Sequence, residues 1–215
     1  MANESSLTRT LEAIVGRFEE TSAARDRALT EGRHIVRLSA NSIRAVHRGD
    51  FDEADELIGQ AGRLLSELTE RLQPHPNVYW AGYVQDAMKE YAEAIATRAF
   101  VLDCSLLGPN DLGVEDAPYL NALAEAASEL RREVLDALRR NDVARAERLL
   151  SRMDDVYDIL VSVDFPDAVT GGLRRATDQL RAVLERTRGD VTITLTQQRL
   201  EGAIKQAQAR FDDRP

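Results

Sequence analysis

Several residue types are scarce in this 215-residue chain, and each scarcity excludes a class of structure. The single cysteine, Cys104, can form neither an intrachain disulfide nor a cysteine zinc site, and we expect it to pack as a small apolar side chain. Only 12 glycines and 6 prolines are present, which argues against long flexible linkers. No apolar run approaches the roughly 18 residues that span a bilayer. The N-terminal residues lack the pattern of a secretory signal, so we expect a cytoplasmic protein without a membrane partner.

Lysine is also scarce, and arginine supplies almost all of the positive charge. Lysine occurs only at Lys89 and Lys205, although 28 residues are lysine or arginine, and the formal net charge is −9. This balance argues against a protein covered by positive potential, but it allows basic residues to cluster on one face. The arginine fork matches phosphate geometry better than lysine does. A high genomic GC content would produce the same bias, and both interpretations stay open.

The common catalytic and nucleotide-binding motifs are absent. The sequence contains no GxGxxG, no phosphate-binding glycine loop, no GxSxG and no HExxH. The three histidines, His34, His47 and His75, lack the spacing of a histidine metal site. The common nucleotide-binding, α/β-hydrolase and zinc-protease classes are therefore excluded.

The pattern that is present is helical throughout. Apolar residues recur at intervals of three and four, with no sustained alternation of period two. Gly49 and Asp50 are expected to end one helix and cap the next, Asn141 or Asp142 to start a later one, and Gly189 to end another. The predicted fold is all-α, a stack or bundle of about seven helices, several long and antiparallel, in a single domain over 1–215. The predicted helices cover about 5–48, 51–73, 78–106, 118–140, 141–163, 168–188 and 191–211.

The segment MKEYAEAIATRAF carries two carboxylates, Glu90 and Glu93, in a stretch that is otherwise nearly apolar. On a helix they share one stripe with Asp86 and Thr97. If partly buried, such carboxylates need a cation or hydrogen-bond donors, and a divalent metal with oxygen ligands meets that need. An acidic chain also produces such pairs by chance, as the same spacing of Glu53 and Glu56 illustrates. From spacing alone a water-facing helix surface is the more frequent explanation.

The predicted helix over 118–140 offers a second carboxylate pair. Glu125 and Glu129 are four residues apart on one face, and leucines and a valine line the opposite face. An ordinary water-facing side is again the simple interpretation. If the two carboxylate pairs faced each other, they could hold one or two Mg²⁺ or Mn²⁺ ions, which lower the pKa of bound water for hydrolysis.

The predicted first helix carries a row of arginines at spacings of four and seven. A strip of this kind can follow a phosphate backbone, or it can pair with acidic residues of a neighbouring helix, and both interpretations stay open. The row consists of Arg33, Arg37, Arg44 and Arg48.

Five segments in order along the chain resemble the translin family, in particular its archaeal members similar to translin-associated factor X. They span about residues 20 to 190 and read ARDRALTEGRHIVRLSANSIRAVHRGD, GYVQDAMKEYAEA, YLNALAEAASELRR, MDDVYDILVSVDFPDA and GGLRRATDQLRAVLERTRGD. The resemblance implies an all-α fold of seven helices and assembly into hollow, roughly octameric homo-oligomers. It also implies binding of single-stranded RNA and DNA.

The resemblance further implies a metal-dependent endoribonuclease site. In EYAE, Glu90 and Glu93 match one family motif, and Glu129 matches the glutamate of a second motif whose aspartate falls at Glu125. By this resemblance the four glutamates are catalytic, and Glu93 and Glu129 hold Mg²⁺ or Mn²⁺. The arginine row would neutralise the strand. Two alternatives are a translin-like binder of single strands that does not cut, and a helical scaffold with neither activity.

Overall fold

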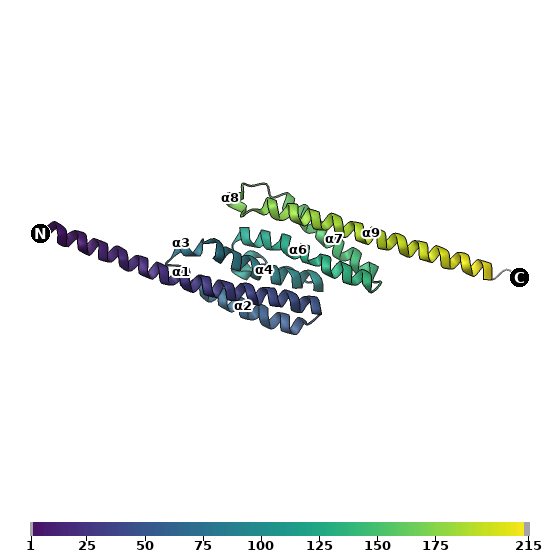
Figure 1. The fold of residues 1–215 in the computed structure, drawn as a ribbon, viewed down its shortest axis with the longest axis horizontal. Coiled ribbons are helices and arrows are strands. Elements are labelled where there is room, and N and C mark those ends of the chain that lie inside the picture. The colour runs from purple at the N-terminus through teal and green to yellow at the C-terminus, as the bar shows by residue number, and fades with distance from the viewer. Residues whose placement is uncertain (1, 213–215) are drawn as a thin grey trace. The chain divides into compact units, whose positions relative to one another are not determined.

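The computed structural model describes residues 2–212, and every regular element in that range is a helix (Figure 1). This confirms the predicted all-α class. Six helices are long and three have four residues. Their bounds are α1 Ala2–Arg48, α2 Phe51–Leu72, α3 Pro76–Tyr79, α4 Gly82–Leu102, α5 Pro109–Leu112, α6 Asp116–Arg139, α7 Val143–Val161, α8 Asp167–Thr170 and α9 Leu173–Asp212.

Three predicted boundaries are wrong. No helix ends at Gly189, because α9 continues through it to Asp212 and merges the two C-terminal helices that the sequence predicted. The predicted helix over 78–106 is divided into α3 and the longer α4, and the expected loop over 106–118 contains α5. The start predicted near 168 belongs to α8, which ends before Gly171 and Gly172, both with positive φ.

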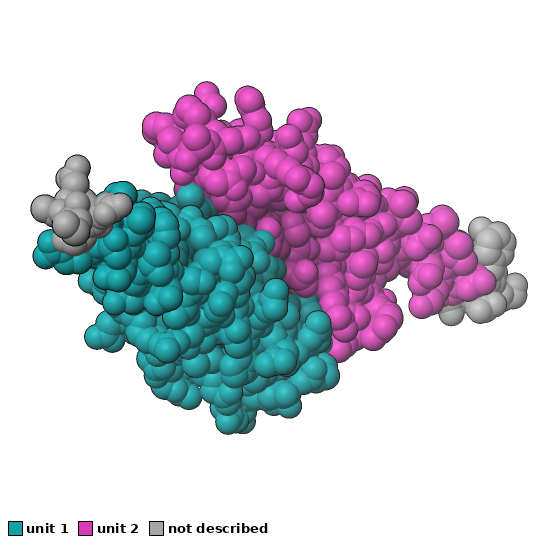
Figure 2. Space-filling view, turned by 60° about the vertical axis from the view of Figure 1, so that its left-hand side comes forward, with its two compact units in different colours: residues 1–95, 107–119 teal, residues 96–106, 120–215 magenta. Residues whose placement is uncertain are grey.

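The helices form two compact units, which are coloured separately in Figure 2. Unit 1 contains residues 1–95 and 107–119, and unit 2 contains residues 96–106 and 120–215. Helices α4 and α6 each contribute to both units. The two carboxylate pairs predicted from the sequence lie on these two helices.

In unit 1, α1 and α2 pack against each other as an antiparallel pair (Figure 1). Gly49 at φ +78° reverses the chain, and Asp50 caps α2 by accepting a hydrogen bond from the Glu53 amide at 3.3 Å. Both roles were predicted. The apolar stripe of α2 is buried as its spacing requires. The largest buried side chains of the unit are Ile35, Val46, Leu65, Leu68, Leu72 and Met88.

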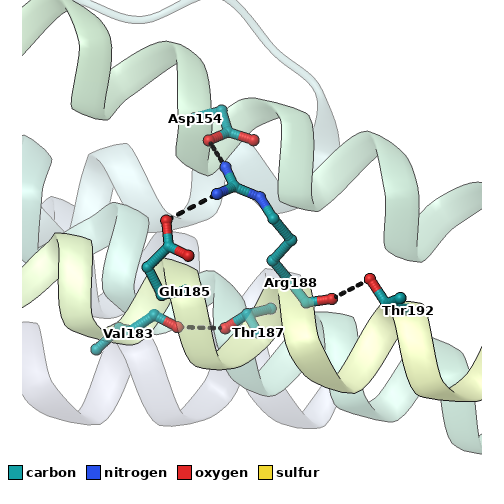
Figure 3. Close-up of polar contacts among 6 residues, drawn as sticks. All are labelled: Asp154, Val183, Glu185, Thr187, Arg188 and Thr192. Atoms are coloured by element: carbon teal, nitrogen blue, oxygen red, sulfur yellow. Dashed lines mark hydrogen bonds and ion pairs between the residues drawn. The ribbon is translucent and has the colours of Figure 1, made fainter.

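In unit 2, α7 packs along α9 (Figure 1). The turn before α7 has the same arrangement as the turn between α1 and α2. Asn141 has a φ of +60°, and Asp142 accepts a hydrogen bond from the Arg145 amide at 3.0 Å. Figure 3 shows how Arg188 of α9 joins Asp154 of α7 at 2.5 Å and Glu185 of its own helix at 2.7 Å. The buried core includes Leu130, Met153, Leu160, Leu173, Leu180 and Leu184.

The outer parts of the two longest helices carry exposed apolar side chains at helical spacing. On α1 these are Leu7, Leu11, Val15 and Phe18, and on α9 they are Ile193, Leu200 and Ile204, each about half exposed or more. Cys104 is exposed as well, so the prediction that it packs as a buried apolar residue is wrong. Over the described part of the chain, no helix combines the length and the apolarity that crossing a membrane requires.

Candidate metal and nucleic-acid site

The EYAE segment forms the middle of α4, and its two carboxylates differ in exposure. Glu93 is buried, with 7% of its surface exposed. Glu90 is half-buried, and its Oε1 lies 3.3 Å from Lys89 Nζ, which also lies 3.5 Å from Asp86. A carboxylate as buried as Glu93 is stable only with charged or hydrogen-bonding partners, so its burial argues against the water-facing interpretation.

Two glycines let α4 approach the other helices of unit 1. A β-carbon on Gly32 of α1 would lie 3.3 Å from the backbone oxygen of Tyr83. A β-carbon on Gly62 of α2 would lie 2.6 Å from the hydroxyl oxygen of Tyr91, which stands between the two glutamates of the motif. Burial raises the pKa of Tyr91. The backbone surfaces of α1 and α2 therefore fix the register of the segment that carries Glu90 and Glu93.

One turn beyond Glu93, the hydroxyl of Thr97 is fully buried without a hydrogen-bond partner among the described residues. Other helical threonines, such as Thr10, Thr21 and Thr192, donate to the carbonyl oxygen four residues earlier. Burying a hydroxyl without a hydrogen-bond partner costs folding free energy. The Thr97 hydroxyl is therefore available to hydrogen-bond to a ligand bound in the site. Thr97 was on the predicted stripe, but its burial could not be read from the sequence.

In unit 2, Glu125 and Glu129 lie on one face of α6, and both are half-buried. One polar contact to another element lies one turn before the pair, and a second, local one lies within it. Asn121 is buried and donates through Nδ2 to the Thr170 carbonyl oxygen at 2.8 Å. Ser128 donates back to the Ala124 carbonyl oxygen at 2.9 Å.

Three of the four predicted carboxylates form a group that could hold a metal ion. One carboxylate oxygen from each of Glu90, Glu93 and Glu125 lies within 4.8 Å of the others. Glu129 is not part of this group of three. Hard carboxylate oxygens are the ligands that Mg²⁺ and Mn²⁺ prefer, and the orphan Thr97 hydroxyl lies one helical turn from Glu93. The residues present therefore fit a hard divalent cation.

The arginine row of α1 is exposed along its whole length. Arg48 pairs with Glu53 at the start of α2, and Arg44 donates to Asn41 Oδ1 at 2.6 Å. Arg33 and Arg37 have neither an ion pair nor a hydrogen bond from their side chains within residues 2–212. Each of the two interpretations therefore applies to part of the row. The C-terminal arginines contact neighbouring side chains, whereas the guanidinium groups of Arg33 and Arg37 are open to a phosphate.

Comparison with known proteins places this chain in one family. No family model matches the chain. The structures of AfC3PO alone and of AfC3PO with duplex RNA are each 34% identical to it, with TM-scores of 0.80 and 0.81. In both cases the match covers 87% of this chain and 97% of the other. The chain therefore belongs to the translin family, which includes the C3PO proteins.

Two more distant similarities also extend over most of the chain. The structure of apo-NeC3PO, at 18% identity, shares the fold with a TM-score of 0.77 over 86% of this chain and 96% of its own. The uncharacterised protein MJ0175 of Methanocaldococcus jannaschii is 28% identical over 200 residues, which are 92% of this chain and 88% of its length.

Proposed function

We propose that this protein binds RNA and cleaves it by divalent-metal-dependent hydrolysis, acting as a homo-oligomer. The observation that carries the proposal is the group of three carboxylates at Glu90, Glu93 and Glu125, of which Glu93 is buried. The RNA-binding part of the proposal is supported by the AfC3PO structure that resembles this chain, because that structure contains duplex RNA. Whether single strands or duplexes are the preferred substrate is part of the test.

In this proposal Glu93 and Glu129 hold Mg²⁺ or Mn²⁺, with Glu90 and Glu125 completing the site. A bound divalent cation lowers the pKa of a water molecule and neutralises charge that develops on the phosphate. The proposal requires α4 and α6 to present their carboxylates to a common space when RNA is bound. Glu125 stands where the family motif has an aspartate, so its longer arm adjusts the position of the ligand oxygen.

The reaction is the addition of water across one phosphorus–oxygen bond. A water oxygen attacks the phosphorus, the bond to one ribose oxygen breaks, and that oxygen leaves with a proton. Another carboxylate of the site, Glu90 or Glu125, accepts the proton that the attacking water loses. In this proposal the Thr97 hydroxyl hydrogen-bonds to a group bound at Glu93 and fixes its orientation.

Contacts with the strand come from the α1 arginines in this proposal. Arg33 and Arg37 are exposed and make no ion pair with another described residue, so they can bind phosphates without first breaking one. Arg44 and Arg48 must exchange their contacts with Asn41 and Glu53. Because arginine contacts with phosphates release bound counterions, binding should weaken as salt rises.

Self-association is supported by the exposed apolar rows on the outer parts of α1 and α9. Phe18, for example, is 70% exposed and Leu200 is 61% exposed. Apolar rows at helical spacing on long helices are typical of surfaces that bury themselves against another helix. We propose that a second copy of this chain covers them, and native mass measurement tests this against the 23.9 kDa monomer.

The function is tested by incubating the protein with labelled single-stranded RNA, duplex RNA and single-stranded DNA. Each substrate is tested with Mg²⁺, with Mn²⁺ and with EDTA. Cleavage of RNA that needs the metal and disappears in Glu93→Gln supports the enzyme. Tight binding without cleavage at saturating protein identifies a non-catalytic binder instead. No binding even at low salt would leave only the scaffold alternative.

A further inference from the structure

Arg132 lies on the same face of α6 as the carboxylate pair. It follows Glu129 by three residues, an interval that makes side chains neighbours on a helix, and Glu125 by seven, which places it on the same face two turns away. An open hollow of about 520 Å³ covers this face, and its lining includes Ser128, Glu129 and Arg132. The guanidinium group is exposed to solvent. A cation therefore stands beside one of the proposed metal ligands, within one hollow of unit 2.

Arg131 and Arg139 on the same helix have structural partners, whereas Arg132 has none among the described residues. Arg131 lies 2.9 Å from Asp190 and donates to the Thr187 hydroxyl at 3.1 Å, which ties α6 to α9. Arg139 lies 3.4 Å from Asp136. Arg132 makes no ion pair or side-chain hydrogen bond with any residue that the structure describes, although acidic residues stand three positions before it and four after it. The fold thus makes no visible use of this charge.

We infer that Arg132 binds a non-bridging oxygen of the RNA phosphate that occupies the carboxylate site, an inference that rests on the proposed function. An acidic protein that uses glutamates to hold a metal must still attract a polyanion to them, and a guanidinium beside those glutamates reduces the repulsion. The planar fork can donate two parallel hydrogen bonds to one phosphate. Arg132 then both positions the phosphate and stabilises the charge that grows on it during hydrolysis.

The test uses the full-length protein and two readouts. In EDTA, where no cleavage occurs, Arg132→Gln should weaken the binding of single-stranded RNA and reduce the slope of log affinity against log salt by about one. With Mg²⁺, kcat/KM for RNA should fall about 100-fold. Arg132→Lys keeps the charge but loses the fork, so it should restore the salt slope and only part of the rate.

Arg139→Gln is the matched control, because Arg139 lines the same hollow but is already paired with Asp136. It should change affinity and rate less than twofold, and the melting temperatures of all variants are compared to exclude unfolding. An unchanged salt slope and rate in Arg132→Gln would overturn the inference while leaving the enzyme intact. If the wild type binds but does not cleave RNA, the nuclease fails and the salt slope alone decides the role of Arg132. Absence of RNA binding by the wild type overturns both.

Discussion

The hydroxyl oxygen of Tyr91 lies 2.6 Å from the position that a β-carbon on Gly62 would occupy. Tyr91 follows Glu90 directly and precedes Glu93 by two residues, so its ring links the acidic segment of α4 to the backbone of α2. The absence of a side chain at Gly62 is what allows this approach. The position of the proposed ligands in unit 1 therefore depends on a glycine in another helix.

Gly62→Ala should destabilise the protein and displace the motif. Alanine normally stabilises a helix relative to glycine by about 1 kcal/mol. Here the new methyl group overlaps the Tyr91 ring, and overpacking of this kind costs about 1–3 kcal/mol. Urea unfolding should show a net loss of stability, accompanied by weaker binding of Mn²⁺.

Gly59→Ala is the matched control in the same helix. A β-carbon at Gly59 meets only the Arg63 guanidinium, at an ordinary contact distance of 3.5 Å. This variant should be as stable as the wild type or more stable, by up to about 1 kcal/mol. Equal stability of the two alanine variants would refute the contact between Gly62 and Tyr91.

Divalent cations should stabilise the wild type against heat and should not stabilise Glu93→Gln. At a concentration about 100 times the Kd, ligand binding adds about 2.7 kcal/mol to the free energy of unfolding. For a chain of this size that corresponds to a rise in Tm of roughly 5–10 °C. Thermal unfolding with and without Mn²⁺ measures the effect.

Glu56→Gln serves as the control for charge alone. Glu53 and Glu56 have the same spacing as Glu90 and Glu93, but Glu56 is exposed on α2. Its replacement should leave the Mn²⁺-dependent rise in Tm unchanged. A rise that persists in Glu93→Gln, or that vanishes in both variants, would show that the cation binds elsewhere.

The stability that Tyr79 contributes should be lost at alkaline pH. Burial, and then the hydrogen bond and negative charge of Glu115, raise the pKa of Tyr79 to about 12. The phenol donates to Glu115 Oε1 at 2.5 Å. Because the folded pKa is above the ordinary value of 10.0, the contribution is complete below pH 10 and falls as the pH rises towards 12.

Tyr79→Phe isolates this contribution, since phenylalanine keeps the ring and cannot ionise. At about pH 8 the wild type should be more stable by about 1.5–3 kcal/mol, the value of a hydrogen bond to a charged acceptor. The difference between the two proteins should narrow above pH 10. A difference that stays constant as the pH rises would contradict the assigned hydrogen bond.

The helix boundaries that could be predicted from the sequence are those fixed by residues next to the boundary itself. Asp50 and Asp142 cap helices as predicted, because a side chain next to its own helix start needs no tertiary information. The prediction that a helix ends at Gly189 was wrong, because glycine is tolerated inside a helix whose other residues are buried in the core. Val191, two residues later, is such a buried residue. Tertiary burial therefore decided where α9 continues.

Gly189→Ala tests that explanation directly. The residue is helical in the middle of α9, and a β-carbon there would meet nothing within 4 Å. The substitution should raise the free energy of unfolding by about 0.5–1 kcal/mol. Gly172→Ala, at φ +89°, should lower it instead. A destabilising Gly189→Ala would indicate that the backbone bends at this position.

The candidate site could be predicted only one helix at a time. The spacing of Glu90 with Glu93, and of Glu125 with Glu129, follows from helical geometry within a segment. The burial of Glu93 and of the Thr97 hydroxyl depends on which neighbouring residues cover α4, and helical periodicity alone does not specify them. For the same reason the sequence could not distinguish Arg131, which forms an ion pair with Asp190, from Arg132, which forms none with the described residues.

The most direct test of the metal site is a crystal structure of the protein soaked with Mn²⁺, with anomalous scattering used to locate the ion. We predict a peak roughly 2.0–2.6 Å from carboxylate oxygens of Glu93 on α4 and of Glu125 or Glu129 on α6. Absence of a peak at these carboxylates in crystals that bind Mn²⁺ elsewhere would contradict the proposed metal site, and with it the nuclease.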